Sequence, residues 1–277
     1  MNRLNKESLL GQEIELTDAR EFLSKISEEA GETLGKYFIS GNYSSRQKEG
    51  VDFTTQADEE VDSFLRESIK RKYPNTNFLT EETAPDDYTP LKNAENLWVI
   101  DPLDGTINFS RKHSNFAISI ALVNKGKSKL AVVYLPVTKD LYWAQEDQEG
   151  TYLNGLPVGV SETDDLGKSV IGCDWAWGLE KRKNIIFWLS KICTHVRQIK
   201  SMGSAVSDLA SLSSGKIDCY IHSGLKPWDV AASSFLVTKA GGRITTPNGE
   251  VWDVFNSDIF ASNNLLHQKI IDLLNKA

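Results

Sequence analysis

Residues 98–109 read WVIDPLDGTINF, and the apolar run at the start of this stretch ends in two carboxylates, a glycine and a threonine. A short apolar run that stops at a turn is typical of a buried β-strand. Asp101 and Asp104 follow three positions apart, and Pro102 stiffens the turn between them by fixing φ. Two carboxylates this close repel each other unless a cation or a proton lies between them. The stretch therefore predicts a strand whose end holds metal ions and, beside them, a phosphate.

The size and composition of the chain are those of an ordinary globular protein. Its 277 residues fit one large domain or two closely packed halves, and contents of 40% hydrophobic and 25% charged residues allow a sizeable core. The net charge of −7 comes without a dense run of Lys or Arg, which argues against a general nucleic-acid or membrane-surface role. A small anionic substrate would therefore need a cation at its site.

The N-terminal segment MNRLNKESLLGQEIELTD has no apolar stretch followed by a cleavage site. No later run approaches the roughly 20 apolar residues of a membrane span, so we expect a cytoplasmic protein. Cys173, Cys193 and Cys219 are odd in number and lack CxxC spacing. We therefore expect buried thiols rather than a disulfide framework or a zinc site.

Two helices are expected near the N-terminus. The first has apolar residues four apart, at Phe22, Ile26, Ala30, Leu34 and Phe38. Thr17 or Asp18 is its expected cap. Residues 40–53 are expected to form a loop or a hairpin, and the second helix is expected to begin near Thr55 and to stop before Pro74.

The rest of the chain divides into two parts with different patterns. Short β-type runs come first, at residues 77–80, 96–101, 116–123, 129–136 and 140–145. Later strands, at 169–175, 196–201 and 219–224, alternate with helices near 180–194, from Ser204, and from Pro227 to Gly241. This order predicts an α+β fold with layered helices and mixed sheets. Because no linker or repeat interrupts it, we expect a single domain over 1–277, with approximate halves at 17–160 and 161–277.

Further acidic residues lie where the expected backbone turns. Glu81 and Glu82 follow a strand-like run, and Asp58 and Asp229 lie in the first turns of expected helices. Oxygen ligands without cysteine suit Mg²⁺, which prefers carboxylates, carbonyls and water. Asp58 or Asp229 taken alone is also explained as a helix cap, and Glu81-Glu82 taken alone as a solvated pair in a loop. A cap cannot explain both aspartates of DPLDGT, which therefore indicate function.

The aspartate spacing separates two phosphate chemistries. A phosphatase with a covalent aspartyl nucleophile of the haloacid-dehalogenase type has its second aspartate two residues later, whereas Asp104 lies three after Asp101. The spacing therefore disfavours a covalent aspartyl phosphate. The Leu103 carbonyl is placed to join both carboxylates on one or two metals, and the backbone N–H groups of Gly105 and Thr106 are available to an anion.

With TEE upstream and GLKPWDVAASSFLVTKAGG downstream, WVIDPLDGTINF closely resembles the inositol monophosphatase family of Mg²⁺-dependent, lithium-sensitive phosphatases. The resemblance runs from about residue 17 to the end of the chain. It implies a layered αβαβα sandwich, two to three Mg²⁺ ions, a small phosphorylated substrate and a homodimer. The metal ligands that it implies are Glu81, Asp101, the Leu103 carbonyl, Asp104 and Asp229, with Glu82 accompanying Glu81.

The resemblance also implies roles in catalysis and substrate binding. Asp58 and Thr106 resemble the pair that orients and helps to deprotonate the attacking water, Glu81 acts with them through its metal, and the amides of Gly105 and Thr106 hold phosphate oxygens. The alcohol half of the substrate is expected to meet Gly203, Ser204, Ala205 and the strand that carries His222.

One position departs from the inositol-specific members. They have a glutamate seven residues before the last aspartate, whereas His222 occupies that position here, which removes an acceptor anion and adds a donor or a positive charge. With Lys226, His222 would suit a more anionic substrate; each is also explained as a surface residue without substrate contact. Trp175 and Trp177 replace smaller residues, and we expect at least one of them to pack in the core.

These observations predict a Mg²⁺-dependent phosphomonoesterase that acts on a small polyol or sugar phosphate, with inositol 1-phosphate as the first candidate. Histidinol phosphate, fructose 1,6-bisphosphate, NADP and 3′(2′),5′-bisphosphate nucleotides are the alternatives on the same scaffold. A non-catalytic interaction protein is a third hypothesis, which the loss of a metal ligand would favour, and no ligand position is lost here.

Overall fold

The first of two sheets is built from the middle of the chain. The computed structural model describes residues 14–47 and 53–276. Seven strands form this sheet in the order β3-β4-β5-β6-β7-β8-β9. All neighbours pair antiparallel except β3 and β4, which are parallel. Its strands are β3 (Asn77–Thr80), β4 (Leu97–Asp104), β5 (Ala117–Asn124), β6 (Lys127–Leu135), β7 (Asp140–Gln145), β8 (Thr151–Leu153) and β9 (Leu156–Val158).

The second sheet comes from the C-terminal part. Its five strands lie in the order β11-β10-β12-β14-β13, and both parallel and antiparallel pairs occur in it. They are β10 (Val170–Cys173), β11 (Gln198–Lys200), β12 (Cys219–Ser223), β13 (Arg243–Thr245) and β14 (Asp258–Ser262). A separate antiparallel pair, β1 (Ser45–Gln47) and β2 (Phe53–Thr55), precedes α2, as expected for a hairpin or loop over 40–53. Residues 48–52 lie outside the described part.

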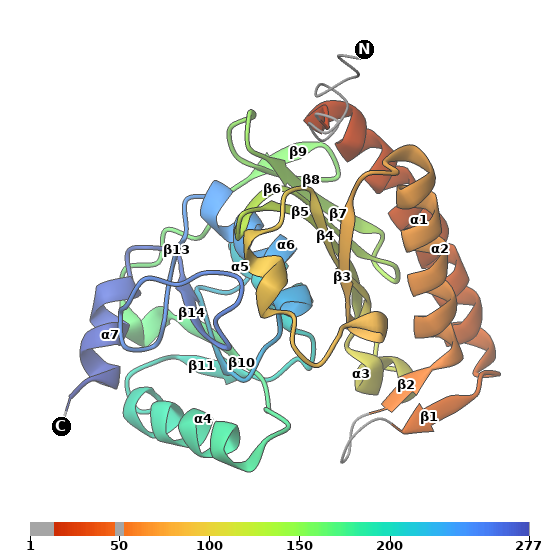
Figure 1. Cartoon of the computed structure of the whole chain (residues 1–277). Helices are drawn as coiled ribbons and strands as arrows, with labels where there is room; N and C mark the ends of the chain where they lie inside the picture. The colour runs from red at the N-terminus through yellow and green to blue at the C-terminus, as the bar shows by residue number, and fades with distance from the viewer. Residues whose placement is uncertain (1–13, 48–52, 277) are drawn as a thin grey trace.

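Helices cover both sheets and fill the space between them. In Figure 1, α1 (Leu16–Ser40) and α2 (Gln56–Lys72) lie on the outer face of the first sheet. Between the two sheets lie α5 (Ala205–Ser213) and α6 (Pro227–Lys239), while α4 (Leu179–Ile192) and α7 (His267–Leu274) cover the far face of the second sheet. The short α3 (Thr106–Ser110) and the 3₁₀ turns Glu81–Thr83, Thr89–Asn93 and Leu166–Lys168 complete the fold. The layers therefore run αβαβα, as predicted.

The apolar spacing of the first helix explains its position. Leu23, Ile26, Ala30 and Leu34 are buried against the sheet, and each such side chain contributes about 1.5–3 kcal/mol when it leaves water. The helix begins earlier than expected, because the carboxylate of Glu15 accepts hydrogen bonds from the first backbone N–H groups. The cap is therefore Glu15, and the expectation of Thr17 or Asp18 is wrong.

Several expectations from the sequence need correction. Cys173 and Cys219 are buried free thiols, but Cys193 is exposed. The region after residue 242, where no element is predicted from the sequence, contains β13, β14 and α7. A search of the helices in the described ranges finds none that is both long and apolar enough to span a membrane.

Candidate active site

The centre of the site is the end of β4, where the strand pairing changes. The β4–β5 register shifts between Asp101 and Asp104, so the chain bulges at the two carboxylates. The backbone N–H of Leu103 donates to Asp101 Oδ1 at 3.0 Å, which closes the turn around the first carboxylate. A bulge of this kind aims side chains that regular pairing would send to opposite faces. The DPLD spacing therefore places both carboxylates on one side of the sheet edge.

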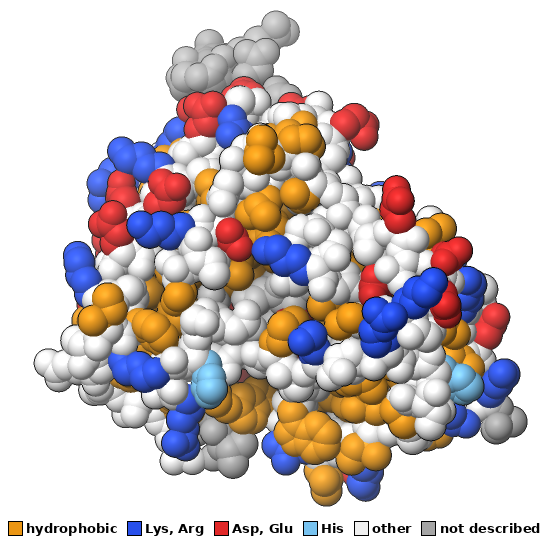
Figure 2. Space-filling model, turned by 180° about the vertical axis from the view of Figure 1, so that it is seen from behind, with side chains coloured by type: hydrophobic (Ala, Val, Ile, Leu, Met, Phe, Trp, Pro, Cys, Tyr) orange, Lys and Arg blue, Asp and Glu red, His pale blue; other side chains and the backbone are white. Residues whose placement is uncertain are grey.

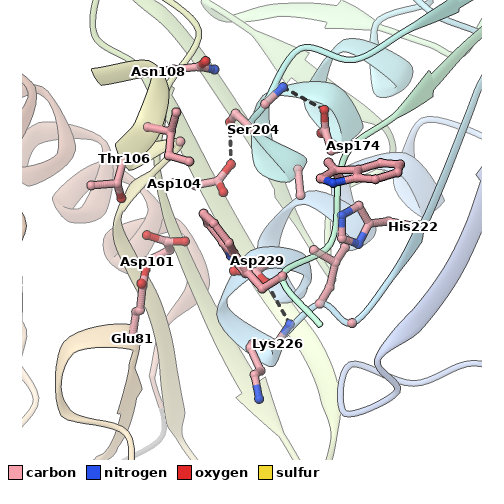
Figure 3. Close-up of a pocket in the computed structure, with 18 of the residues that line it drawn as sticks. Glu81, Asp101, Asp104, Thr106, Asn108, Asp174, Ser204, His222, Lys226 and Asp229 are labelled. Carbon is pink, nitrogen blue, oxygen red and sulfur yellow. Dashed lines mark hydrogen bonds between the residues drawn. The ribbon is translucent and has the colours of Figure 1, made fainter. Parts of the chain in front are cut away.

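Three carboxylates meet at this edge. Asp101, Asp104 and Asp229 each offer an oxygen, and these oxygens all lie within 4.8 Å of one another. Figure 3 shows the three side chains pointing toward one another, two from β4 and one from the start of α6. Asp229 also caps α6, because its Oδ2 accepts from the N–H of Lys226 at 2.7 Å. The cap and the site interpretations of Asp229 are therefore compatible.

Electrostatics in the cluster favour a cation. Burial, followed by the nearby Glu81 carboxylate, raises the pKa of Asp101 well above its usual range. Burial raises the pKa of Asp104 to about 7, although hydrogen bonds from Ser204 and Val206 oppose the shift. Burial and the Asp104 carboxylate raise the pKa of Asp229. Like charges in one buried site disfavour ionisation unless a positive charge joins them, so this donor set fits Mg²⁺.

The two glutamates of the TEE motif lie next to this cluster in different ways. Glu81 lines the cavity, and Figure 3 shows its carboxylate beside that of Asp101. Glu82 does not line the cavity but is near enough for its charge to raise the pKa of Asp58. The structure therefore places Glu81 at the cavity beside Asp101 and leaves Glu82 outside the cavity lining.

Asp58 and Thr106 approach each other from α2 and α3. Thr106 Oγ1 lies 3.3 Å from Asp58 Oδ1 and 3.2 Å from the Leu103 carbonyl oxygen. The other oxygen of Asp58 accepts from the N–H of Thr55 at 2.9 Å and from its hydroxyl, so Asp58 also caps α2. Burial raises the pKa of Asp58 to about 7, against the hydrogen bond from the Thr55 hydroxyl. A group with this pKa can exchange a proton at neutral pH.

Gly105 permits the sharp change from β4 to α3. Its φ is +92°, a left-handed conformation that favours glycine. A Cβ at this position would lie 3.0 Å from the Asn115 carbonyl oxygen and 3.2 Å from Ser204 Cβ. Since the first N–H groups of a helix have no partner within it, the amides at Gly105 and Thr106 are available to an anion.

Ser204 lies in the segment expected to meet the alcohol half of the substrate, but its hydroxyl group contacts Asp104. The Ser204 hydroxyl donates to Asp104 Oδ2, and the N–H of Val206 donates to the same oxygen at 2.8 Å. Gly203 and Ala205 line the cavity on either side of Ser204. Ser204 is therefore a positioning group for Asp104, and its neighbours face the open space.

His222 is neither a surface histidine nor a positive charge. It lies in β12, is only 5% exposed and lines the cavity. Burial lowers its pKa to about 4, against the attraction of Asp174 and Asp258, so the imidazole is neutral at pH 7. Lys226 is exposed at the same cavity. The suggestion that His222 adds positive charge for a more anionic substrate is therefore wrong.

The expectation that at least one of Trp175 and Trp177 packs in the core is wrong. Trp175 is 52% exposed and Trp177 is 50% exposed, and both line the cavity that contains the carboxylates. The cavity has a volume of about 550 Å³, within the range of small-molecule sites.

Asp174, which precedes Trp175 directly in the sequence, also lines the cavity and is not among the residues predicted from the sequence. Its Oδ1 accepts from the Gly203 N–H at 2.7 Å and from the Ser201 hydroxyl at 3.2 Å, and its Oδ2 accepts from the Tyr220 hydroxyl at 3.2 Å. Asp174 therefore fixes the segment before α5. The signal was present, since Asp174, like Asp101, ends an apolar strand-like run.

A layered αβαβα scaffold with an acidic cluster at a strand end, beside a helix N-terminus, fits the class of phosphatases whose carboxylates hold metal ions. The chain belongs to the inositol monophosphatase family, whose pattern matches residues 15–277. An inositol monophosphatase of Dictyostelium discoideum is 33% identical over 245 residues, which cover 85% of this chain and 89% of the relative.

Two further relatives carry different descriptions. A fructose-1,6-bisphosphatase/inositol-1-monophosphatase of Thermotoga maritima is 28% identical over 259 residues, covering 94% of this chain and 96% of the relative. The crystal structure of the extragenic suppressor protein suhB from Bartonella henselae superposes with a TM-score of 0.86 at 28% identity, covering 94% of this chain and 99% of the other. Membership of the family therefore supports a phosphatase and leaves its substrate open.

Proposed function

We propose that this protein is a Mg²⁺-dependent phosphomonoesterase that hydrolyses a small phosphorylated alcohol by direct attack of water. The observation that carries the proposal is the approach of three carboxylate oxygens, from the buried Asp101 and the partly buried Asp104 and Asp229, within 4.8 Å of one another, in a cavity that also contains Thr106 and Gly105. A cluster of this kind is unfavourable without cations.

The residues that would hold two to three Mg²⁺ ions are Glu81, Asp101, the Leu103 carbonyl, Asp104 and Asp229. When bound, Mg²⁺ supplies the positive charge that lowers the pKa of water and stabilises the leaving oxygen. This chain supplies the fixed carboxylates, and its hydrogen bonds from Ser204 and Val206 hold Asp104 in place.

The protein's own groups then handle the proton and the phosphate. Thr106 would orient the attacking water and pass a proton toward Asp58, whose pKa of about 7 lets it accept that proton at neutral pH. The amides of Gly105 and Thr106 would hold phosphate oxygens as charge shifts onto them. Because the phosphoryl group passes directly to water, positioning and charge neutralisation supply most of the catalysis, and no covalent intermediate is needed.

Inositol 1-phosphate is the reference substrate, because it is the first candidate that the resemblance implies. The two relatives from Dictyostelium discoideum and Thermotoga maritima are also named as inositol monophosphatases. His222 lacks the negative charge of the glutamate found in inositol-specific members. The proposal therefore covers the reaction and the class of substrate, a small phosphorylated alcohol. A homodimer, which the resemblance implies, and a cytoplasmic location, which the sequence pattern predicts, are part of the same proposal.

The test is phosphate release by purified protein from inositol 1-phosphate, fructose 1,6-bisphosphate, glycerol 2-phosphate and adenosine 3′-monophosphate. Each substrate is assayed with Mg²⁺, with a chelator, and with Mg²⁺ plus lithium. We expect release that requires Mg²⁺ and is inhibited by lithium. Turnover that persists in the chelator would contradict the proposal.

Asp104→Asn and Asp229→Asn test the carboxylates directly. We expect each to lower kcat by about 100-fold or more at saturating Mg²⁺, since even outer groups of metal sites are worth about 10–100-fold. Asp272→Asn is the matched control, because Asp272 lies on α7, hydrogen-bonded to Gln268 and away from the cavity. Rates like those of the unmodified protein in either site variant would refute the ligand assignment.

A further inference from the structure

Two segments near the acidic cluster take no part in the proposed reaction. One carries Trp175 and Trp177 and leads into α4, at the lower edge of the molecule, where Figure 2 shows hydrophobic side chains. The other, residues 84–94, runs from the turn at Glu81 toward β4, and we call it the strap. The strap contacts the element that carries Asp229, so its packing bears on the metal site.

The strap packs on the hydrophobic cluster that joins the first sheet to α6. Its partly buried apolar side chains are Ala84, Tyr88, Leu91 and Ala94. The same cluster contains Val133 of β6 and Trp228 of α6. Figure 1 shows the strap as the gold segment in front of α6. The strap is therefore tied to the core beside the first turn of α6.

Tyr88 is the contact of the strap with that first turn. Its ring meets the Trp228 ring edge to face, with centroids 5.8 Å apart and an interplanar angle of 68°. The Tyr88 ring also lies 6.3 Å from the Phe255 ring. Burial and then the charge of Asp229 raise the pKa of Tyr88, as expected for a ring that lies near this carboxylate. Tyr88 therefore packs directly on the residue that precedes Asp229.

A second contact attaches the far end of the strap. Lys92 Nζ lies 2.7 Å from Asp253 Oδ2 and 5.9 Å from the centroid of the Phe255 ring. Asp253 is held in turn, since its Oδ1 accepts from the Phe255 N–H at 2.9 Å. Because exposed ion pairs contribute little on their own, the Tyr88 contact is the stronger of the two.

The direction of the Asp229 carboxylate follows the first turn of α6. Its Oδ2 accepts from the N–H of Lys226, the residue that caps this helix, so the side chain moves with the turn. The other two carboxylates of the cluster repel Asp229, and this repulsion favours moving the turn away from the end of β4. The ring contact on Trp228 opposes that movement, as does the Ser119 hydroxyl, which donates to the Trp228 carbonyl oxygen at 3.4 Å.

We propose that Tyr88 is a positioning residue, which holds Trp228 so that the Asp229 carboxylate is in place to bind a divalent cation with the other two aspartates of the cluster. Tyr88 does not line the cavity, whereas Trp228 does, so Tyr88 acts through Trp228. A site that is already ordered binds more tightly, because binding then costs less ordering. This inference rests on the proposed function, because it concerns the metal affinity of the same site.

Titration of the protein with Mn²⁺, followed by the electron paramagnetic resonance signal of the free ion, measures metal binding without turnover. Mn²⁺ accepts the carboxylate ligands that Mg²⁺ accepts. The binding step that Asp229→Asn removes identifies the site. We expect Tyr88→Ala to raise the dissociation constant of this step by roughly 3- to 12-fold, which is the worth of an aromatic pair. Tyr88→Phe, which keeps the ring, should stay within about twofold of the unmodified protein.

The phosphatase assay gives a second readout. Tyr88→Ala should raise the Mg²⁺ concentration needed for the half-maximal rate by the same roughly 3- to 12-fold factor, and it should leave kcat at saturating Mg²⁺ within about twofold. A merely structural role of Tyr88 would lower the amount of folded enzyme and hence the rate at every Mg²⁺ concentration.

Tyr152→Ala is the matched control. Tyr152 also packs on a tryptophan, with its ring centroid 4.1 Å from that of Trp143 in the first sheet, and it does not line the cavity. We expect no change in its Mn²⁺ dissociation constant. Tyr88→Leu, which keeps an apolar side chain on the core cluster, replaces Tyr88→Ala if that variant does not fold, and should raise the constant by at least about threefold.

The outcomes separate this inference from the proposed function. Unchanged Mn²⁺ affinity in Tyr88→Ala, or an equal loss in Tyr152→Ala, would overturn the inference while the proposed function stands. If Asp229→Asn removed no binding step at all, the ligand set of the proposed function would be contradicted, and the inference would fail with it.

Discussion

Asp208, in α5, is a buried carboxyl group that no part of the proposed reaction uses. It is fully buried, and neither of its oxygens accepts a hydrogen bond from another described group. Burial, followed by the nearby Asp174 carboxylate, raises the pKa of Asp208 to about 10. The nearby Asp174 carboxylate, which accepts from the Gly203 N–H, thus favours the protonated form of Asp208. The substrate-side segment thus rests on a protonated carboxylic acid.

The stability of the protein should therefore depend on pH through this residue. Between the unfolded pKa of about 3.8 and the folded pKa of about 10, the native state binds one more proton than the unfolded state. The contribution of Asp208 is complete below the lower value and is lost as pH rises toward the upper one, by about 1.4 kcal/mol per pH unit. Asp208→Asn keeps a neutral side chain at every pH. Its free energy of unfolding, relative to that of the unmodified protein, should therefore rise by about 1.4 kcal/mol per pH unit.

Urea unfolding of both proteins at pH 6, 7 and 8, at one fixed Mg²⁺ concentration, measures this difference. Ser213→Ala is the control, since Ser213 is also buried on α5 but has no ionisable group. Its difference from the unmodified protein should stay flat with pH. A flat difference for Asp208→Asn as well would show that Asp208 carries no extra proton.

At the level of elements, the patterns with a clear period were predictable from the sequence. The spacing on α1, the short β-type runs of β4 to β7, and the Pro-to-Gly limits of α6 all appear within a few residues of their expected positions. The region from Arg243 onward was not predicted, because β13 is only three residues long and its burial depends on pairing with β14. Short strands carry too little periodicity to be recognised alone.

The residues of the candidate site also divide into those that could be predicted from the sequence and those that could not. Residues in compact motifs, such as those of DPLDGT, could be predicted, since a strand end and its turn are local features. Asp174, Trp175 and the neutral state of His222 depend on contacts between β10, α4 and β12, which only the folded chain supplies. Sequence alone therefore predicted the acidic cluster at the end of β4 and misjudged the exposure of Trp175 and the charge of His222.

The N-terminus of α2 allows a test that separates helix capping from site chemistry. Thr55 donates through its N–H and its hydroxyl to Asp58, and all of these groups are buried. We expect Thr55→Val, which keeps the side-chain shape, to lower the free energy of unfolding by about 1–2 kcal/mol, because a cap is lost and a buried carboxylate loses a donor. Urea unfolding of the variant and of the unmodified protein measures this difference in free energy.

Ser24→Ala is the companion variant, since the Ser24 hydroxyl bonds only the Arg20 carbonyl oxygen within α1. Its stability should remain within about 0.5 kcal/mol of the unmodified protein. If Thr55→Val were as stable as Ser24→Ala, the cap would contribute nothing and Asp58 would be held by other groups.

At the scale of the whole molecule, the middle layer joins the two sheets. α6 comes from the C-terminal half of the sequence, yet Val230 and Val237 pack in the cluster with Ile259 of the second sheet, while Ala231 and Leu236 pack in the cluster with Val133 of the first. The site likewise draws on Asp101 from one half and Asp229 from the other. Separating the halves at 160/161 would expose the face of α6 that packs on the first sheet, together with the inner face of that sheet.

We therefore expect one cooperative thermal transition, as for a single domain, in spite of the chain's length. Differential scanning calorimetry should give a calorimetric enthalpy equal to the van't Hoff enthalpy, because neither sheet can keep its inner face buried once α6 detaches. Leu236→Ala, which deletes a fully buried side chain of α6, should shift this one transition downward, with a cost of about 2–5 kcal/mol, and should not split it. Two transitions, or a Leu236→Ala effect on only one of them, would mean that the halves over 17–160 and 161–277 are separate cooperative units.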